Sequence, residues 1–272
     1  LYITRTFFKF FYKFSFKFHE LNTNELKVLN AIKKDGYYVG SSDDLKKMKI
    51  NTKWKESYEL IKELLDQKHN NTKLALNKKE LINIELIEIP INLLQNLYSF
   101  ALSKSFVKII ENYLNSNLSF RGVSIKKDIL DGREIETRKW HIDGEDHRII
   151  KIIFYLNNVD SKGGPFTCIS KKYSKNKFVK RDREGRIENT TINNFFNKNE
   201  IMQFIGNIDK FIIVDTCSVL HKGELPLSDN RYIIFFCYNS IFPIQPHFCK
   251  NLNPMFIGKF KGEFQNKITS KF

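Results

Sequence analysis

The sequence contains no uncharged apolar run that approaches the roughly 18 residues of a membrane-spanning helix, so it predicts no bilayer-spanning segment. Cysteine is scarce, and no two of the four cysteines stand at Cys-x-x-Cys spacing. This pattern argues against a zinc knuckle and against a small secreted fold held by disulfides, so we expect a reducing, cytoplasmic location. The composition is globular, with 42% hydrophobic and 28% charged residues. A length of 272 residues fits one large domain or two small ones.

The net charge of +15 raises nucleic acid as a partner, but the basic excess is local. Residues 1–20 carry a net +3, residues 171–186 a net +6 and residues 250–272 a net +4. The rest of the chain is therefore nearly neutral. Lys, Asn, Ile and Phe are all abundant and have AT-rich codons, so genome composition is another source of the charge. We expect no nucleic-acid partner.

Residues 7–18 are aromatic, with a lysine at every fourth position. These lysines interrupt the apolar stretch that a secretory signal peptide requires. As a helix, the segment would carry a basic stripe among aromatic side chains and would suit peripheral contact with an anionic membrane. The alternative is an amphipathic segment that packs on the protein's own body. The chain begins at Leu1 rather than at a methionine, which indicates a fragment or a non-standard start.

Apolar spacing divides the sequence into a helical first part and a strand-rich second part. Three stretches have helical spacing, the last with a break near Ser103: 24–34, 54–67 and 91–114. A short strand at 37–39 follows the helix-ending pair Asp35-Gly36. Six further segments are rich in β-branched or aromatic residues: 119–128, 134–143, 149–156, 166–169, 211–220 and 232–240. This order predicts a mainly β fold of the α+β class, a sandwich or barrel with flanking helices.

The segment Trp140-His141-Ile142-Asp143-Gly144 is the first candidate for chemistry. On a strand, residues two apart point to the same face, so His141 and Asp143 would present an imidazole and a carboxylate to one point. Alone, this pair is weak evidence, because a His-x-Asp arises readily by chance. A lone histidine is also more often a core or surface residue than a ligand.

Further motifs follow in a set order: the strand 149–156, Asn157–Asp160, Gly163-Gly164-Pro165, Gly206, Phe211–Thr216, His221-Lys222-Gly223 and Arg231. Over roughly residues 120–240, this order resembles the iron(II)- and 2-oxoglutarate-dependent dioxygenases, specifically the phytanoyl-CoA dioxygenase-like branch. The segment Asp35-Gly36-Tyr37 also resembles the usual start of that family.

The resemblance implies a double-stranded β-helix (jelly-roll, cupin-like) core and an Fe(II) centre with His141, Asp143 and His221 as metal ligands. Two histidines and one carboxylate on a face of an octahedral iron leave three positions open. In the family, 2-oxoglutarate occupies two of them and O2 the third. Arg231 would bind the distal carboxylate of 2-oxoglutarate, because a guanidinium is a planar and permanently charged partner. We expect His221 and Arg231 on neighbouring antiparallel strands.

The implied activity is hydroxylation of a small organic substrate, coupled to oxidative decarboxylation of 2-oxoglutarate to succinate and CO2. A related halogenase would need a small residue in place of Asp143. A non-catalytic jelly-roll binding module has no need of a complete ligand set together with Arg231. A basic nucleic-acid or membrane-surface protein is the third alternative, and one continuous basic face would favour it.

Lys151 shares a strand face with Ile153 and Tyr155. If that face is the inner one, the lysine needs an anionic partner, and a carboxylate of 2-oxoglutarate is one. Otherwise it is a strand-edge lysine whose ammonium group reaches water. The sequence leaves both interpretations open. We expect Trp140 to serve packing and Asp215 to serve hydrogen bonding in a turn.

The sequence departs from the family after the Gly-Pro turn, where Ser170-Lys171-Lys172-Tyr173 replaces Pro-Gly-Ser-His. The long insertion 171–205 that follows is a candidate lid. Its basic first half suits an anionic substrate, for example a phosphorylated, sulfated, CoA-, lipid- or glycan-linked compound, and a solvated loop is the alternative. We predict an N-terminal segment and one dioxygenase domain, divided as follows: segment 1–20, helical part 21–118, jelly-roll core about 119–245 and C-terminal tail 246–272.

Overall fold

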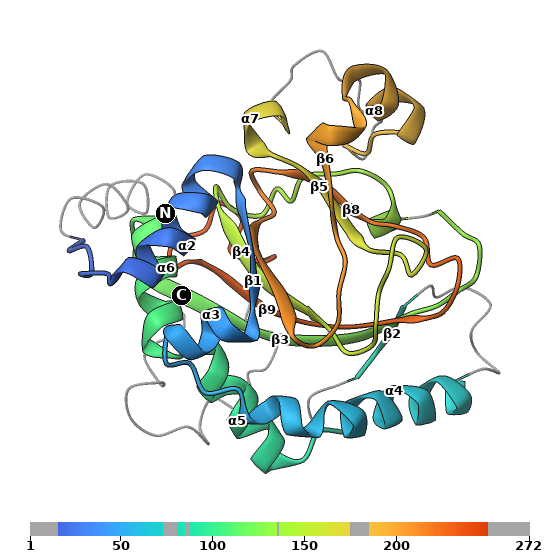
Figure 1. The fold of residues 1–272 in the computed structure, drawn as a ribbon, viewed down its shortest axis with the longest axis horizontal. Helices are drawn as coiled ribbons and strands as arrows, with labels where there is room; N and C mark the ends of the chain where they lie inside the picture. The colour runs from blue at the N-terminus through green and yellow to red at the C-terminus, as the bar shows by residue number, and fades with distance from the viewer. Residues whose placement is uncertain (1–15, 73–80, 85–87, 135, 175–184, 250–272) are drawn as a thin grey trace.

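Two antiparallel sheets form the body of the computed structural model, which describes residues 16–72, 81–84, 88–134, 136–174 and 185–249 (Figure 1). The large sheet has the strand order β1-β7-β4-β9-β3-β2: β1 Tyr37–Ser41, β2 Leu81–Asn83, β3 Leu118–Asp128, β4 Ile149–Tyr155, β7 Lys210–Asp215 and β9 Arg231–Ser240. The small sheet has the order β6-β5-β8: β5 Phe166–Ile169, β6 Ile201–Phe204 and β8 Leu220–Gly223. From β4 onward the chain crosses repeatedly between the two sheets, as in a jelly roll.

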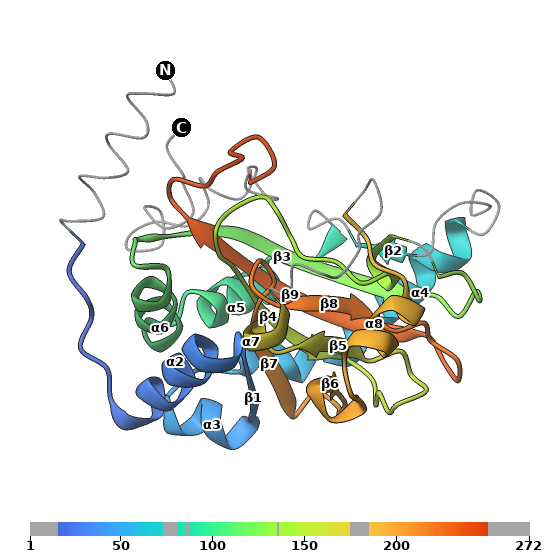
Figure 2. The ribbon, with the colours of Figure 1, turned by 90° about the horizontal axis from the view of Figure 1, so that it is seen from above.

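Helices flank the two sheets. One group lies on the outer side of the large sheet in Figure 1: α2 Thr23–Asp35, α3 Ser42–Lys47, η1 Lys53–Ser57, α4 Tyr58–Thr72, α5 Ile91–Ala101 and α6 Lys104–Leu114. The second group lies beside the small sheet in Figure 2: α7 Lys171–Ser174 and α8 Asn189–Phe195. Two further short 3-10 turns complete the described elements: η4 Glu136–Arg138 and η5 Lys198–Glu200. None of the helices in the described residues is long and apolar enough to span a membrane.

The two-residue period of the strands separates the core into two layers. In β4, Ile152 and Phe154 belong to the cluster between the large sheet and the helices, where Trp54 packs edge-on against Phe154 and Phe236. The alternate residues of β4 face the small sheet, and Ile153 and Tyr155 belong to that inner cluster. Lys151 therefore faces the interior between the two sheets. A lysine in that position needs an anionic partner for its ammonium group.

Both ends of helix α2 are specified locally. Asn22 and Glu25 form a capping box at the start of α2, and Gly36 ends the helix in a left-handed conformation, with φ of 85°. The carbonyl of Gly36 accepts a hydrogen bond from the backbone N–H of Asp215 at 2.8 Å. This contact ties the helical part of the chain to the end of β7, next to the candidate site.

The predicted class, mainly β with flanking helices and a jelly-roll core, is confirmed, while several predicted strands are wrong in detail. In place of the expected strand 134–143, the described residues 136–143 form a loop with one 3-10 turn, because the buried Arg138 side chain draws the chain back toward Asp128 and Asp131. The expected strand 211–220 is two strands in different sheets, separated by a turn in which Asp215 accepts from the backbone N–H of Cys217. Strand β6 lies inside the predicted insertion 171–205 and pairs with β5.

Candidate metal centre

Three side chains from two distant segments meet at one edge of the small sheet. His141 and His221 form an isolated antiparallel bridge, with a backbone hydrogen bond of 2.9 Å in each direction. The backbone N–H of Asp143 donates to the carbonyl oxygen of Thr216 at 3.0 Å. These contacts hold the extended segment of His141 and Asp143 beside β8, so the two residues share a face although no full strand forms there.

The three side chains lie close enough together to share one metal ion. The Nε2 atoms of His141 and His221 lie 3.7 and 3.8 Å from Oδ1 of Asp143. One ligand atom from each residue lies within 4.8 Å of the others, and the two imidazole rings are 4.2 Å apart at their centroids. Two imidazoles and one carboxylate are the donor set that non-haem Fe(II) oxygenases use.

Backbone carbonyls set the tautomer of both histidines. Nδ1 of His141 lies 2.8 Å from the carbonyl oxygen of Lys139, and Nδ1 of His221 lies 3.1 Å from that of Val219. Because a carbonyl only accepts hydrogen bonds, each Nδ1 carries the proton in the neutral ring. The lone pair of each Nε2 is therefore directed toward the space beside Oδ1 of Asp143. Metal-binding histidines in proteins are commonly oriented in this way, by a hydrogen bond from the other ring nitrogen to a backbone carbonyl.

Burial keeps both imidazoles neutral. The side chain of His221 is only 5% exposed, and burial, followed by the neighbouring His141, lowers the pKa of His221 to about 3. Burial also lowers the pKa of His141, against the opposing effect of Asp143. Neutral imidazoles near pH 7 are ready to donate a lone pair without first losing a proton.

The two carboxylate oxygens of Asp143 have different partners. Oδ1 faces the imidazole nitrogens, whereas Oδ2 accepts a hydrogen bond from the Lys151 ammonium at 2.6 Å. Burial by itself would raise the pKa of Asp143, but the charge and hydrogen bond of the Lys151 ammonium hold that pKa well below its usual range. Asp143 is therefore an anion whose second oxygen is fixed by Lys151.

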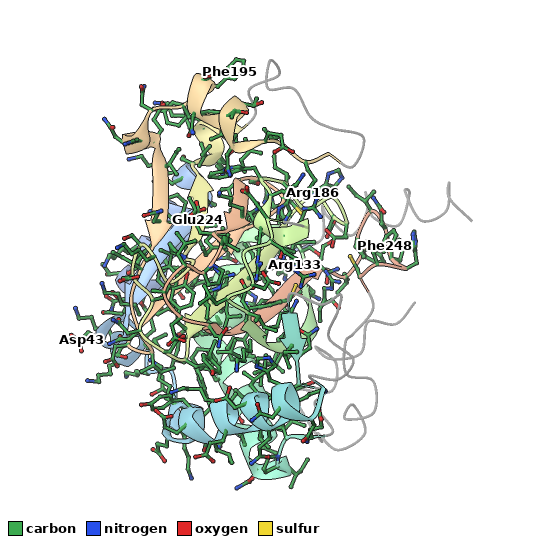
Figure 3. The ribbon with its side chains drawn as sticks, turned by 90° about the vertical axis from the view of Figure 1, so that its right-hand side faces the viewer. Asp43, Arg133, Arg186, Phe195, Glu224 and Phe248 are labelled. Atoms are coloured by element: carbon green, nitrogen blue, oxygen red, sulfur yellow. The ribbon has the colours of Figure 1, made fainter. Side chains whose placement is uncertain are left out.

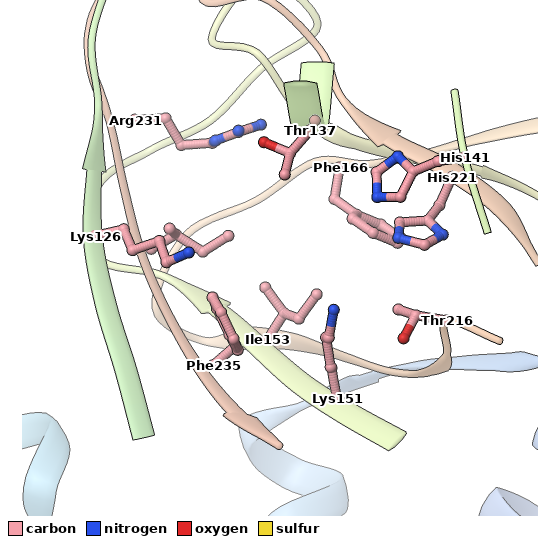
Figure 4. Close-up of a pocket in the computed structure, with 12 residues that line it drawn as sticks. Lys126, Thr137, His141, Lys151, Ile153, Phe166, Thr216, His221, Arg231 and Phe235 are labelled. Carbon is pink, nitrogen blue, oxygen red and sulfur yellow. The ribbon is translucent and has the colours of Figure 1, made fainter. Parts of the chain in front are cut away.

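A cavity of about 130 Å³ opens in front of the cluster (Figure 4). Its lining combines basic side chains with apolar ones: Lys126, Thr137, His141, Lys151, Ile153, Phe166, Thr216, His221, Gly223, Arg231, Ile233 and Phe235. In Figure 4 the two histidines and Arg231 lie on opposite sides of this space, with Lys151 below them. Pockets for drug-sized ligands are about 300–1,000 Å³, so this cavity suits a smaller molecule.

Arg231 is buried at the far side of the cavity. Its Nη2 donates to Oδ2 of Asp128, while Nε and Nη1 are buried without a hydrogen-bond partner among the described residues. The expected neighbouring strands of His221 and Arg231 are wrong, because β8 belongs to the small sheet and β9 to the large one. Both residues nevertheless line the same cavity, since the two sheets face each other across it.

Solved structures share this architecture. The crystal structure of EctD from S. alaskensis with 2-oxoglutarate and 5-hydroxyectoine aligns with a TM-score of 0.55 and 15% identity, over 83% of this chain and 80% of that one. The structure of HygX from Streptomyces hygroscopicus with nickel and 2-oxoglutarate bound aligns with a TM-score of 0.52 and 13% identity, over 81% and 88%. The chain has their fold. No protein-family model matches the sequence, and a search of curated proteins found no match.

Trp140 and Asp215, near the site, have the roles that the sequence predicted for them. Trp140 is buried against Ile187 and Leu220, on the far side of β8 from the cluster. Asp215 accepts hydrogen bonds from the Tyr113 hydroxyl at 2.6 Å and from the backbone N–H of Ile149 at 3.2 Å, which confirms a hydrogen-bonding role.

The sequence patterns gave no site role to four residues that shape the site: Lys126, Asp128, Phe166 and Thr216. Phe166 stacks on the His221 ring, with 5.5 Å between centroids. Thr216 supplies the backbone acceptor for Asp143 and lines the cavity. Asp128 lies two residues beyond Lys126 on the same strand face, but that position predicts neither the loop that brings back Arg138, ten residues on, nor the pairing with the strand of Arg231.

Proposed function

We propose that this chain is an Fe(II)- and 2-oxoglutarate-dependent oxygenase of the phytanoyl-CoA dioxygenase-like branch that hydroxylates a small organic substrate. One observation carries the proposal: His141, Asp143 and His221 converge on a cavity whose opposite side holds a buried arginine with two unused donors. Neither a structural ion pair nor a simple binding pocket accounts for that combination.

The donor set fits iron. His141 and His221 would supply their Nε2 lone pairs, and Asp143 would supply Oδ1, the oxygen that faces both imidazoles. All three groups are already in their metal-binding protonation states, since the imidazoles are neutral and the carboxylate is ionised. Lys151 would keep Asp143 in place through Oδ2.

The cavity fits a small dicarboxylate such as 2-oxoglutarate. The unpartnered Nε and Nη1 of Arg231 call for an anionic acceptor, because a buried donor without a partner costs roughly 1–3 kcal/mol. Ile153 and Ile233 provide apolar walls for a short methylene chain. The EctD and HygX structures of the same fold contain 2-oxoglutarate, which supports this assignment.

When bound, iron and 2-oxoglutarate would activate O2 and release succinate and CO2. The chain's own side chains do the positioning. Arg231 would orient the distal carboxylate, the apolar wall would exclude water from the chain of the acid, and Thr216 would hold the Asp143 backbone. Lys151 stays a candidate for the 2-oxoglutarate contact, and its ammonium lies beside the metal cluster rather than beside Arg231 (Figure 4).

The substrate would enter from the side of the insertion 171–205. The described parts of this insertion include α7 and α8. Phe195, at the end of α8, is 45% exposed and projects from the molecule (Figure 3). Most of the basic first half of the insertion, residues 175–184, lies outside the described residues. An anionic substrate and a lid function for this insertion remain our proposals from the sequence.

The deciding experiment is an anaerobic titration of the purified protein with Fe(II) and then 2-oxoglutarate, followed by the weak visible charge-transfer absorption of the chelate. We expect a band that requires both components and that is lost in His141→Ala and in Asp143→Ala. The matched control is His147→Ala, an exposed histidine six residues from the first ligand, which should keep the band. Succinate formation should disappear in the same two variants.

Absence of the band in folded wild-type protein would refute the proposal and leave a binding module as the better description. Normal succinate formation by Asp143→Ala would refute the metal assignment alone. Arg231→Ala should keep the metal and raise the required 2-oxoglutarate concentration strongly, because it removes a buried charge-assisted contact. An unchanged requirement would move the carboxylate site to Lys151.

A further inference from the structure

Asp128 lies at the centre of a buried charge cluster behind the cavity. It is the last residue of β3, it is 1% exposed, and it stands directly opposite Arg231 in the β3–β9 register. Its Oδ2 accepts from Nη2 of Arg231. Its Oδ1 accepts from Nε and Nη2 of Arg138 at 3.2 and 2.5 Å. One carboxylate therefore joins two buried guanidinium groups.

The remaining donors of the two arginines differ. Arg138 has further acceptors in the carbonyl oxygens of Ile129 and Arg133, each at 2.6 Å, and in the carboxylate of Asp131. Among the described residues, Asp128 is the only hydrogen-bond acceptor for the guanidinium of Arg231, and the other two nitrogens have no partner there. Asp128 thus fixes one nitrogen of Arg231 and leaves the rest of the guanidinium for a ligand.

Gly223 constrains the same guanidinium sterically. A Cβ atom on Gly223 would stand 2.5 Å from Nη2 and 3.3 Å from Cζ of Arg231. Both distances are below normal van der Waals contact, so any side chain at this position would displace the guanidinium. Gly223 follows His221 by two residues on β8, so the strand that carries a metal ligand also leaves the space that Arg231 occupies.

We propose that Asp128 and Gly223 are positioning residues for the cosubstrate: Asp128 anchors Nη2 of Arg231, and Gly223 leaves room for the guanidinium beside β8. This inference rests on the proposed function, because it assigns 2-oxoglutarate to Arg231. It adds two residues that act through Arg231 to the set that determines cosubstrate affinity. It also gives a physical reason for glycine in the His-x-Gly segment.

The test measures the dissociation constant of 2-oxoglutarate by titrating the anaerobic Fe(II)-loaded protein and following the charge-transfer absorption. Asp128→Asn removes the charge that holds Nη2, and Gly223→Ala displaces the guanidinium, so each should weaken binding about tenfold or more, the size expected when a contact of a charged group is impaired. Fe(II) affinity, measured separately without 2-oxoglutarate, should stay within about twofold of wild type, as expected for residues that do not touch the metal ligands. The matched control is Asp131→Asn, which loses a carboxylate that contacts Arg138 but not Arg231, and it should keep wild-type 2-oxoglutarate affinity.

A double-mutant cycle separates positioning from general disruption of the fold. Arg231→Lys retains a cation but has no Nη2, so neither Asp128→Asn nor Gly223→Ala should weaken 2-oxoglutarate binding further in that background. Equal fold losses in the wild-type and Arg231→Lys backgrounds would overturn the inference. If Asp128→Asn does not fold, Gly223→Ala alone decides between these outcomes. If the wild-type protein binds Fe(II) but no 2-oxoglutarate, the proposed function and this inference fail together.

Discussion

In each of the three side chains of the candidate centre, one polar atom is hydrogen-bonded within the protein and the other is available to a ligand. The Nδ1 atoms of His141 and His221 are bound to backbone carbonyls, and Oδ2 of Asp143 is bound to Lys151. The atoms that remain, two Nε2 and one Oδ1, are those that face each other. The residue types alone are compatible with many functions. The hydrogen bonds that orient these side chains are what favour metal binding.

The buried histidines should make the metal-free protein sensitive to acid. The folded pKa of His221 is about 3, below the roughly 6.5 of an unfolded histidine, so between these values the unfolded chain binds more protons. Stability is therefore fully present above about pH 6.5 and falls as the pH drops through that value. We expect the thermal midpoint in chelator to fall from pH 7.5 to 5, and to fall less steeply in His221→Gln.

The control for this prediction is His247→Gln, since His247 is exposed and lies outside the cluster. That variant should reproduce the pH dependence of the wild type. An identical pH slope in His221→Gln would show that His221 is not the source of the acid sensitivity.

Between secondary-structure elements, the turn from α2 into β1 depends on a single glycine. Gly36 has a φ of 85°, and a Cβ there would stand 2.5 Å from Cγ1 of Val219, in the turn before β8. The same glycine binds Asp215 through its carbonyl, next to Thr216 and the Asp143 segment. A side chain at position 36 would therefore disturb both the helix end and the support of the site.

We expect Gly36→Ala to lower the free energy of unfolding by about 2–5 kcal/mol, from the left-handed backbone and from overpacking against Val219. Gly132→Ala is the matched control, because Gly132 has a φ of 74° and no atom within 4 Å of its ideal Cβ. It should lose only the backbone part, about 1–2 kcal/mol. Equal losses in urea unfolding of the two variants would contradict the role of Val219.

For the whole molecule, the site joins the two sheets, so ligands should stabilise the fold. His221 comes from the small sheet, Arg231 and Lys151 from the large one, and the cavity lies between them.

The terminal basic segments fall mainly in residues 1–15 and 250–272, outside the described residues, so peripheral membrane contact through residues 1–20 stays a prediction.

We expect the thermal midpoint to rise when Fe(II) and 2-oxoglutarate are added together without oxygen. At a ligand concentration of about 100 times its Kd, the stabilisation is about 2.7 kcal/mol, which is roughly 5–10 °C for a domain of this size. Asp143→Ala should lose the shift. A midpoint that rises equally in Asp143→Ala would place ligand binding outside the candidate centre.

Local patterns in the sequence located the longer helices and most of the strands, and the family resemblance pointed to the residues of the candidate site. Helical spacing located α2, α5 and α6, and the period of two in β4 put Lys151 on the face of Ile153 and Tyr155. These features depend on neighbours a few residues apart, so a single sequence contains them. The ordered motifs likewise brought out His141, Asp143, His221 and Arg231 as one set.

Only the tertiary structure decided which partners these residues have. It paired Lys151 with Asp143, joined Arg231 to Arg138 through Asp128, and assigned β8 and β9 to different sheets. It also converted the expected strand 134–143 into a loop held by Arg138. The geometry of these contacts is set by the packing of one sheet on the other and not by local periodicity, even where the partners, such as Lys151 and Asp143, are only eight residues apart.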